Sequence, residues 1–209
     1  MLEKNSNQKL VQKSLNGIVM LTNPPIGNQG IESSCVGWAT GYAALGILNY
    51  PKYSCWDLAK RSPEYVYNQI KASSDCTSGA YLQDGLNLVC AEGACSWNMM
   101  PYTDQGCSVM PNAAQEFEAS HHSASSWSAF SANSVSQIKQ SLDLGYPVVI
   151  GFNVYDSFYT MWNNGGIWTT PNSGQNHGGH AVCIVGYDDN QQMFKVQNSW
   201  GLGGAQGFF

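Results

Sequence analysis

Residues 27-GNQGIESSCVGWAT-40 place a single cysteine, Cys35, between a turn-rich polar segment and a run of small and aromatic residues. Apolar residues recur at helical spacing over residues 35–49, so Cys35 is predicted to begin a buried helix. Unpaired N–H groups and the helix dipole stabilise a thiolate at such a position. A reactive cysteine is therefore one hypothesis, and it requires a base and a group that orients the base.

A predicted hairpin near the C-terminus supplies both groups. The runs 180-HAVCIVGYDD-189 and 193-MFKVQNSW-200 are β-branched and apolar, and turn residues join them. If the loop is 188-DDNQ-191, His180 comes next to Asn198, within roughly 4.5–8 Å. An amide oxygen that accepts from one imidazole nitrogen fixes the tautomer and leaves the other nitrogen to face a nucleophile.

Helix signals dominate the first part of the chain. Ser62-Pro63-Glu64 combines a capping hydroxyl, a proline at the first helical position and an acid in the first turn. A further helix is expected over 82–91, whereas residues 96–133 are predicted to be irregular with some extended pieces. A capping box at 134-SVSQ-137 is predicted to open a short helix from Ile138 to Leu144.

Strand signals follow the last of these helices. The runs 147-PVVIGFNVY-155 and 165-GGIWTTP-171 are predicted strands, in addition to the two runs of the hairpin. Helices that come first and strands that come later are typical of an α+β fold with segregated elements.

Composition excludes several classes of function. A chain of 209 residues with 43% hydrophobic residues can bury one large domain or two small lobes. The net charge of −5, without clusters of Lys or Arg, argues against nucleic acid or an anionic membrane as a partner. No apolar run approaches the roughly 18–20 residues of a membrane span. The seven cysteines leave at least one thiol without an intrachain partner, and the low charged fraction of 11% favours an exported protein.

Three motifs resemble those of the papain-like cysteine peptidases. The stretch 28-NQGIESSC-35 is similar to the family's Asn-Gln-Gly-x-x-x-Ser-Cys, 179-GHAVCIVGY-187 resembles its histidine strand, and 198-NSWG-201 resembles its Asn-Ser-Trp-Gly. The resemblance spans roughly residues 23–209 and implies a divergent member with the two-lobed α+β fold. It implies a helical lobe at 23–118 with the nucleophile, a β-rich lobe at 119–209 with the His and Asn, and an active site in the cleft between them.

The resemblance also implies a role for each matching residue. Cys35 would be the nucleophile, His180 the general acid/base, and Asn198 the residue that orients His180. Gln29 would donate its amide to the oxyanion of the tetrahedral intermediate. Contacts with the substrate are expected from Gly79, Ala80, Tyr81, Gly179 and Trp200, the last of which would also shield the His–Asn pair.

The expected activity is that of a cysteine endopeptidase that hydrolyses peptide bonds through a thioester acyl-enzyme. The expected partner is a peptide or protein substrate in extended conformation, and we expect a monomer that uses no metal and no other cofactor. Residues 1–22 are interpreted as an N-terminal arm or the remnant of an inhibitory pro-segment. Two alternatives remain open: a catalytically quiet papain-like module that binds peptides, and an acyl transferase or deamidase that uses the same triad.

The chain departs from the family pattern at three places. Glu32 replaces a cysteine that usually forms a bridge toward the region of Cys76, and Val36 replaces the tryptophan that usually follows the nucleophile. After 198-NSWG-201 the chain reads 202-LGGAQGFF-209, where the family has Trp-Gly-x-x-G and a further strand. None of these changes removes one of the four expected catalytic groups.

Other conspicuous groups are interpreted as structural. The pair His177 and His180 lacks the further ligands that a zinc site needs. The remaining assignments are a core position for Cys183, surface or strand positions for His121-His122, a turn at Asp188-Asp189, and packing by the aromatic residues Tyr155, Phe158, Tyr159 and Trp162.

Overall fold

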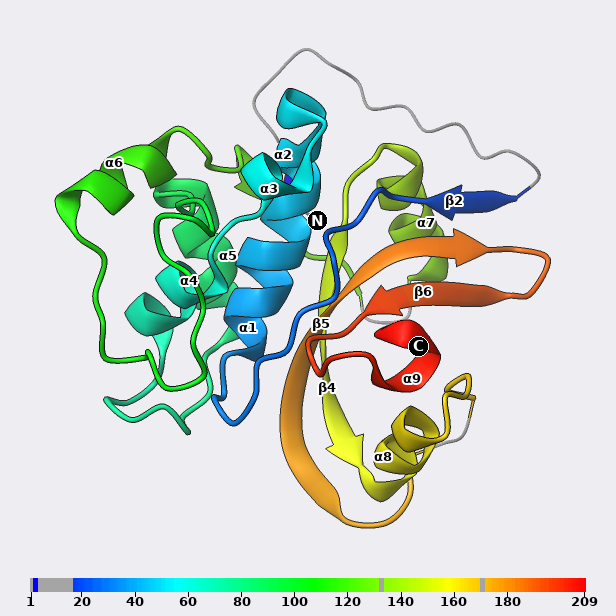
Figure 1. Cartoon of the computed structure of the whole chain (residues 1–209). Helices are drawn as coiled ribbons and strands as arrows, with labels where there is room; N and C mark the ends of the chain where they lie inside the picture. The colour runs from blue at the N-terminus through cyan, green and yellow to red at the C-terminus, as the bar shows by residue number, and fades with distance from the viewer. Residues whose placement is uncertain (1, 4–16, 132–133, 170–171) are drawn as a thin grey trace.

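The computed structural model describes residues 2–3, 17–131, 134–169 and 172–209. The helices are α1 (Cys35–Gly37), η1 (Trp38–Leu45), α2 (Gly46–Tyr53), α3 (Trp56–Ala59), α4 (Pro63–Ile70), α5 (Leu82–Ala91), α6 (Ala113–Ser120), α7 (Val135–Asp143), α8 (Asp156–Asn163) and α9 (Gly203–Gln206). The strands are β1 (Leu2–Glu3), β2 (Ile18–Met20), β3 (Ser126–Trp127), β4 (Val148–Tyr155), β5 (Asn176–Asp188) and β6 (Met193–Gln197). The helices α3 to α6 gather on one side of the molecule, the antiparallel sheet lies on the other side with α7, α8 and α9, and one long helix runs between them (Figure 1).

The long helix runs without a break from Cys35 through α1, the π-helical η1 and α2. Every residue from 36 to 49 is buried, which confirms the prediction of a buried helix that begins at Cys35. The helix continues through Pro51 and ends only at Ser54, whose backbone is left-handed with φ 52°. Its burial on all sides explains why apolar and small residues fill this segment so completely.

Two of the other helix predictions are confirmed and one is wrong. The Ser62 hydroxyl accepts the Tyr65 N–H at 3.0 Å and opens α4, and α5 covers the predicted residues 82–91. The segment 96–133, predicted to be irregular, contains α6. This helix begins with a capping box in which the Asn112 side chain accepts from the Gln115 N–H and the Gln115 side chain accepts from the Asn112 N–H. An Asn-x-x-Gln signal was therefore present in the sequence.

The helix α7 runs from Val135 to Asp143, so it begins three residues before the predicted start at Ile138 and ends one residue before Leu144. The capping box expected there is not formed, because the Ser134 side chain makes no hydrogen bond to the first turn. The helix forms although its predicted cap does not. Packing of Ile138 and Leu142 in the core stabilises it in place of the cap.

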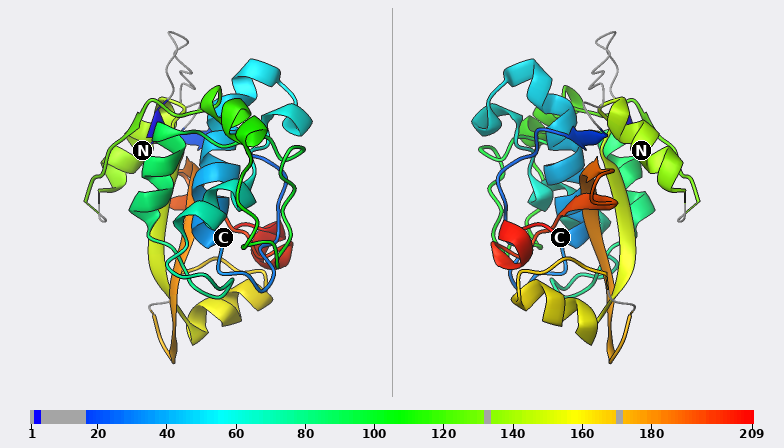
Figure 2. Two further views of the ribbon diagram at one scale, coloured as in Figure 1. Left: turned by 90° about the vertical axis from the view of Figure 1, so that its left-hand side faces the viewer. Right: turned by 90° about the vertical axis from the view of Figure 1, so that its right-hand side faces the viewer.

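The long strand β5 organises the sheet. It pairs with β6 along one edge and with β4 and then β2 along the other, and every pairing is antiparallel. The chain is therefore an α+β protein, as predicted. Figure 2 shows the sheet edge-on beside the helices. Residues 18–20 of the predicted N-terminal arm form β2 and belong to this sheet. The division into lobes at 23–118 and 119–209 stays a prediction.

Two strand predictions need correction. Asp188 pairs with Met193 and not with Gln191, because the turn takes four residues, and an irregularity between Ile184 and Gly186 shifts the register again. The expected strand at 165–171 is not formed by residues 165–169, and residues 170–171 lie outside the described part. Instead, Trp168 packs its ring against Phe152 and Phe158, so aromatic packing and not strand pairing holds this segment.

One hydrophobic core joins the helices to the sheet. Leu45 and Leu48 of the long helix, Tyr65 of α4, and Val182 and Val185 of β5 belong to the same buried cluster. At the N-terminus of the long helix, Val36 and Ala39 pack against Ala181 of β5, and this contact brings the two predicted reactive segments together. Among the described residues, no helix combines the length and the apolar composition needed to cross a membrane.

The packing predicts opposite effects for two glycines of the long helix. A methyl group on Gly37 would lie 2.4 Å from the Pro63 carbonyl oxygen, whereas one on Gly46 would find its nearest atom at 3.7 Å. Gly37→Ala should lower the free energy of unfolding by about 1–3 kcal/mol through overpacking. Gly46→Ala should raise it by up to about 1 kcal/mol, because alanine loses less backbone entropy in a helix. Urea denaturation of both variants measures this difference, and equal effects would contradict the close approach of α1 to α4.

Candidate active site

Cys35 and His180 line the same cleft, which has a volume of about 630 Å³. One wall carries Cys35 and residues 79–82, and the other carries residues of β4 and β5, including Gly179 and His180. The Cys35 side chain packs against Ala181, the neighbour of His180. A larger groove of about 700 Å³ contains none of the predicted site residues, and it lies over Ile150, Ile184 and Phe208.

A buried hydrogen bond fixes the ring of His180. Its Nε2 lies 2.7 Å from the Asn198 Oδ1, and both side chains are buried. The Ser199 N–H donates to the same oxygen at 2.8 Å, which identifies this atom of the amide as the acceptor. Nε2 must therefore carry a hydrogen, and Nδ1 is the nitrogen that remains for acid–base chemistry.

Trp200 covers this hydrogen bond. Its ring stacks on the ring of His180 with centroids 4.4 Å apart and 30° between the planes. Phe158 and Tyr159 of α8 pack against the other parts of the Trp200 ring. The surrounding aromatic groups exclude water from the His180–Asn198 pair, so the pair is stronger than it would be in solvent.

Burial disfavours the charged form of both Cys35 and His180. It raises the pKa of the Cys35 thiol, although the backbone N–H groups of Ala181 and Val36 act against this shift. Burial also lowers the pKa of His180 to about 4, and the hydrogen bond that His180 donates to the Asn198 oxygen raises it in part. Each group alone is therefore held neutral near pH 7, and charge on either one is favoured only when it forms together with charge on the other.

Gln29 is anchored to the segment that follows β6. Its backbone N–H donates to the Ser199 carbonyl at 2.8 Å, and its side-chain oxygen accepts from the Ser199 hydroxyl at 2.8 Å. The side-chain nitrogen donates one hydrogen to the Glu32 carbonyl at 2.9 Å. The second hydrogen of this amide has no acceptor among the described residues, so it is available to a ligand.

The loop from Gln29 to Cys35 is tied to its surroundings by polar contacts. The Tyr102 hydroxyl lies 2.6 Å from the Ser34 hydroxyl and donates to the Gln29 carbonyl at 2.7 Å. Ser33 donates its N–H to the Cys76 carbonyl at 2.9 Å and its hydroxyl to the Thr77 carbonyl at 2.8 Å. These contacts hold the residue before the helix, so Cys35 begins the helix in a fixed position.

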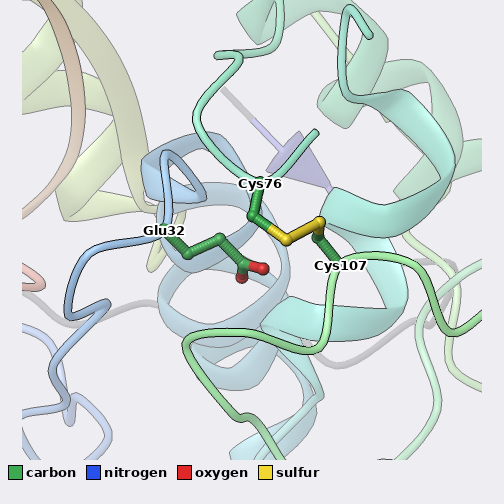
Figure 3. A group of neighbouring side chains, drawn as sticks. All are labelled: Glu32, Cys76 and Cys107. Atoms are coloured by element: carbon green, nitrogen blue, oxygen red, sulfur yellow. A yellow bond between two sulfur atoms is a disulfide. The ribbon is translucent and has the colours of Figure 1, made fainter. Parts of the chain in front are cut away.

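Glu32 lies beside a disulfide in the same region. Cys76 and Cys107 are bonded to each other, and the Glu32 carboxyl points toward their sulfur atoms (Figure 3). This group is the one set of metal-ligating side chains that converge in the described residues. Because both sulfurs are consumed in the disulfide, a single carboxylate is left, and these residues do not fit a metal centre in this state. The other five cysteines are free thiols.

The structure thus gathers most of the predicted site residues. Gly79, Ala80, Tyr81 and Gly179, from which contacts with the substrate are expected, line the cleft with Cys35 and His180. Asn198 and Trp200 do not line this cleft but contact His180, whereas Gln29 is hydrogen-bonded to Ser199 and Glu32. Sequence reasoning missed the cleft residues of β4, namely Gly151, Phe152 and Asn153, and it missed Tyr102, which no local motif identifies.

The groups interpreted as structural also have defined positions. Cys183 is fully buried in the core, as predicted. His177 binds the Asp156 carboxylate at 2.6 Å. The prediction of a surface or strand position is wrong for His122, which is buried beside Glu118 and contacts the Tyr53 hydroxyl. The buried Arg61 shares Glu118 with it, so an internal ion-pair cluster accounts for this histidine.

Comparisons with known proteins agree with this architecture. Residues 24–209 match the model of the papain family cysteine proteases, and the chain belongs to this family. It is 30% identical over 193 residues to an uncharacterized peptidase C1-like protein, L477, of Acanthamoeba polyphaga mimivirus, covering 87% of this chain and 62% of that protein. The chain spans less than two thirds of the length of the curated relatives it matches.

Solved structures show the same fold. Xylellain, a cysteine protease from Xylella fastidiosa, superimposes with a TM-score of 0.78 at 27% identity, over 100% of this chain and 84% of that chain. Bromelain from Ananas comosus, solved in complex with the E64 inhibitor, has a TM-score of 0.72 at 16% identity, over 93% of this chain and 88% of that chain. At this identity the second likeness concerns the fold alone.

The hydrogen bond from His180 to Asn198 predicts a shift in the histidine pKa. Because the Asn198 oxygen raises the pKa of His180 against the effect of burial, Asn198→Ala should lower it further below its usual range. NMR titration of the His180 ring in the native chain and in this variant measures the change. An unchanged or higher pKa in the variant would contradict the assigned role of the amide oxygen.

Proposed function

We propose that this chain is a cysteine peptidase that hydrolyses peptide bonds with Cys35, His180 and Asn198. One observation carries the proposal: the imidazole that shares the cleft with Cys35 is bound through Nε2 to an amide oxygen, at 2.7 Å, which leaves Nδ1 for the nucleophile. A base that is oriented by a third group and faces a thiol is the arrangement required for nucleophilic catalysis. Membership of the papain family supports the same reaction.

The reaction begins with proton transfer within the pair. His180 takes the proton of the Cys35 thiol, and the sulfur attacks the carbonyl carbon of the peptide bond. The tetrahedral intermediate collapses to a thioester, and the leaving amine takes the proton from His180. His180 then removes a proton from water, which attacks the thioester and releases the carboxylic acid, and the proton returns to the sulfur.

The oxyanion of each tetrahedral intermediate is stabilised by two N–H donors. The first is the backbone N–H of Cys35 at the start of the helix, where the helix dipole adds to the hydrogen bond. The second is the remaining hydrogen of the Gln29 amide. Because Gln29 is buried and held through its oxygen by Ser199, this donor is preorganised and loses little entropy when the intermediate forms.

The substrate is a peptide in extended conformation. The backbone at Gly79 and Ala80 lines the cleft opposite Gly179, so backbone groups on both walls can pair with an extended chain. The described residues that line the cleft include no Asp, Glu, Lys or Arg. Two of the lining residues, Leu82 and Phe152, have large apolar side chains. We therefore propose a preference for uncharged, apolar side chains at the subsite that these two residues form.

Two alternatives are separated by measurable properties. A quiet peptide-binding module would not need a histidine oriented toward the cleft, whereas His180 is held in this orientation. An acyl transferase or deamidase would use the same three groups, so it differs only in the acceptor or in the bond cleaved.

Export is supported by the disulfide between Cys76 and Cys107. Activity as a monomer and an inhibitory role for residues 1–22 remain hypotheses of the same proposal.

The proposal predicts complete dependence on the Cys35 sulfur. Cys35→Ala should abolish the hydrolysis of a fluorogenic dipeptide and should leave the melting temperature nearly unchanged, because the substitution removes a single sulfur atom from a half-buried side chain. In the native chain, E-64 should label Cys35 irreversibly, as mass spectrometry of the tryptic peptide would show. Full turnover by the variant would refute the proposal, and a native chain that neither turns over substrate nor reacts with E-64 would favour the quiet module.

A second prediction concerns Gln29. Loss of one preorganised oxyanion donor typically costs on the order of 10²–10³ in kcat, so Gln29→Ala should reduce kcat by this amount with a smaller change in KM. Circular dichroism and thermal denaturation serve as the control, since Gln29 also contacts Ser199 and Glu32. A variant of native stability with unchanged kcat would remove Gln29 from the mechanism.

A further inference from the structure

Glu32 is a buried carboxyl group without a partner, three residues before the nucleophile. The residue is only 1% exposed, and neither carboxylate oxygen forms a hydrogen bond with any part of the chain that the structure describes. The side chain points inward to the disulfide between Cys76 and Cys107 (Figure 3). A charged carboxylate in such a place is costly, because burial removes its hydration and no hydrogen bond within the described residues replaces it.

The groups that face Glu32 add to this cost. Glu64 of α4 is also buried, at 2% exposure, and its negative charge acts on Glu32, as does the charge of Asp104. Tyr67 and Tyr102 are the neutral titratable groups nearby, and the basic Lys71 acts on Glu64. Two acids in one buried region cannot easily ionise together. Glu64 is the better candidate for the charged one, because the Thr103 N–H and the Asn68 amide both donate to it.

The pKa of Glu32 agrees with this geometry. Burial, followed by the charge of Glu64, raises the pKa of the Glu32 carboxyl from 4.5 to about 7. The Tyr102 hydroxyl and the Cys107 N–H approach the carboxyl and act against the shift, but neither reaches the geometry of a hydrogen bond. The neutral carboxyl is therefore the predominant form in acid. Its contribution to the free energy of unfolding is fully present below about pH 4.5 and is lost as the pH rises through about 7.

Glu32 connects the disulfide to the proposed oxyanion donor. Its carbonyl accepts the hydrogen bond from the Gln29 amide nitrogen at 2.9 Å, and Tyr102, which approaches its carboxyl, donates to the Gln29 carbonyl at 2.7 Å. The neighbouring Ser33 is bound to the Cys76 carbonyl. A displacement of Glu32 toward water would therefore move the acceptor that sets the orientation of the Gln29 amide.

We propose that Glu32 is a positioning residue whose neutral carboxyl packs the loop 29–35 against the Cys76–Cys107 bridge and so holds the Gln29 amide toward the cleft. Ionisation of Glu32 draws the carboxylate toward water and loosens this loop. The inference rests on the proposed function, because Gln29 acts as an oxyanion donor only in that reaction. It follows that catalysis, and not only stability, declines when Glu32 loses its proton.

The test is the dependence of kcat on pH in the native chain and in Glu32→Gln. In the native chain, kcat should fall above a midpoint near pH 7, by about tenfold for each pH unit once the neutral form is the minor one. We call this decline of kcat at high pH the alkaline limb. The variant carries a neutral amide in place of the carboxyl, so its alkaline limb should shift to higher pH by roughly one pH unit or more. Glu116→Gln, a change at an exposed glutamate of α6, is the matched control and should leave the limb in place.

A second variant tests the same idea if Glu32→Gln does not fold. Glu64→Gln removes the negative charge that raises the pKa of Glu32, so the alkaline limb should move to lower pH, opposite to the shift in Glu32→Gln. A merely structural role would change the melting temperature of either variant without moving the limb in kcat. An unmoved limb in the folded variants would overturn the proposal.

Hydrogen exchange separates this inference from the proposed function. At pH 8 the backbone amides of a peptide covering residues 27–35 should exchange faster in the native chain than in Glu32→Gln, and at pH 5.5 the two should exchange at similar rates. If the native chain hydrolyses no peptide at any pH, the proposed function fails, and this comparison still decides whether Glu32 holds the loop. Equal protection of the loop in both proteins at pH 8 would overturn the inference.

Discussion

The site depends on the backbone pairing between the loop before Cys35 and the turn after β6. Gln29 donates its N–H to the Ser199 carbonyl at 2.8 Å, and Gly201 donates its N–H to the Gly27 carbonyl at 3.0 Å. These bonds join segments from opposite ends of the chain at the point where the long helix meets the sheet. Because the same loop carries Cys35 and the same turn carries Asn198, one short pairing sets the relative position of the proposed nucleophile and of the residue that orients its base.

The core contacts beneath this pairing make it rigid. The long helix is buried from residue 36 to residue 49, and its side chains pack against β5, which carries His180. A buried helix cannot rotate or slide without opening cavities or creating overlaps. The position of Cys35 relative to His180 is therefore fixed by the hydrophobic core, whereas the hydrogen bonds around Asn198 and Gln29 fix orientation within that frame.

The sequence predicted the parts of the site that follow from local pattern. A buried helix that starts at Cys35 and a hairpin that joins His180 to Asn198 both depend on periodicity over neighbouring residues. The hairpin brought the two together although its register was wrong, because neighbouring positions across a strand pair lie close in several registers. Family motifs then assigned roles that periodicity alone could not assign, and those roles remain proposals.

The parts that could not be predicted depend on contacts between distant segments. No local feature of Tyr102 indicates that its hydroxyl binds both Ser34 and Gln29, and Trp168 forms a packing contact where its segment reads as a strand. Glu32 is the clearest example, since an acid in a polar loop is expected at the surface. The helix α6 differs from these, because the Asn112–Gln115 capping box that opens it is a local signal in the sequence, although the surrounding segment has an irregular pattern.

Burial of the reactive pair has a consequence for how its charge arises. Desolvation raises the pKa of the Cys35 thiol and lowers that of His180, so neither group gains from ionising separately through exchange with bulk water. Transfer of the proton from the sulfur to the imidazole creates both charges at once and leaves the net charge of the pocket unchanged. The attraction between the two new charges, the helix dipole at Cys35 and the Asn198 oxygen at His180 then act together against the cost of burial. Apolar packing around Cys35 and His180 is therefore compatible with the thiolate that the proposed reaction requires, because the transfer leaves the net charge of the pocket unchanged.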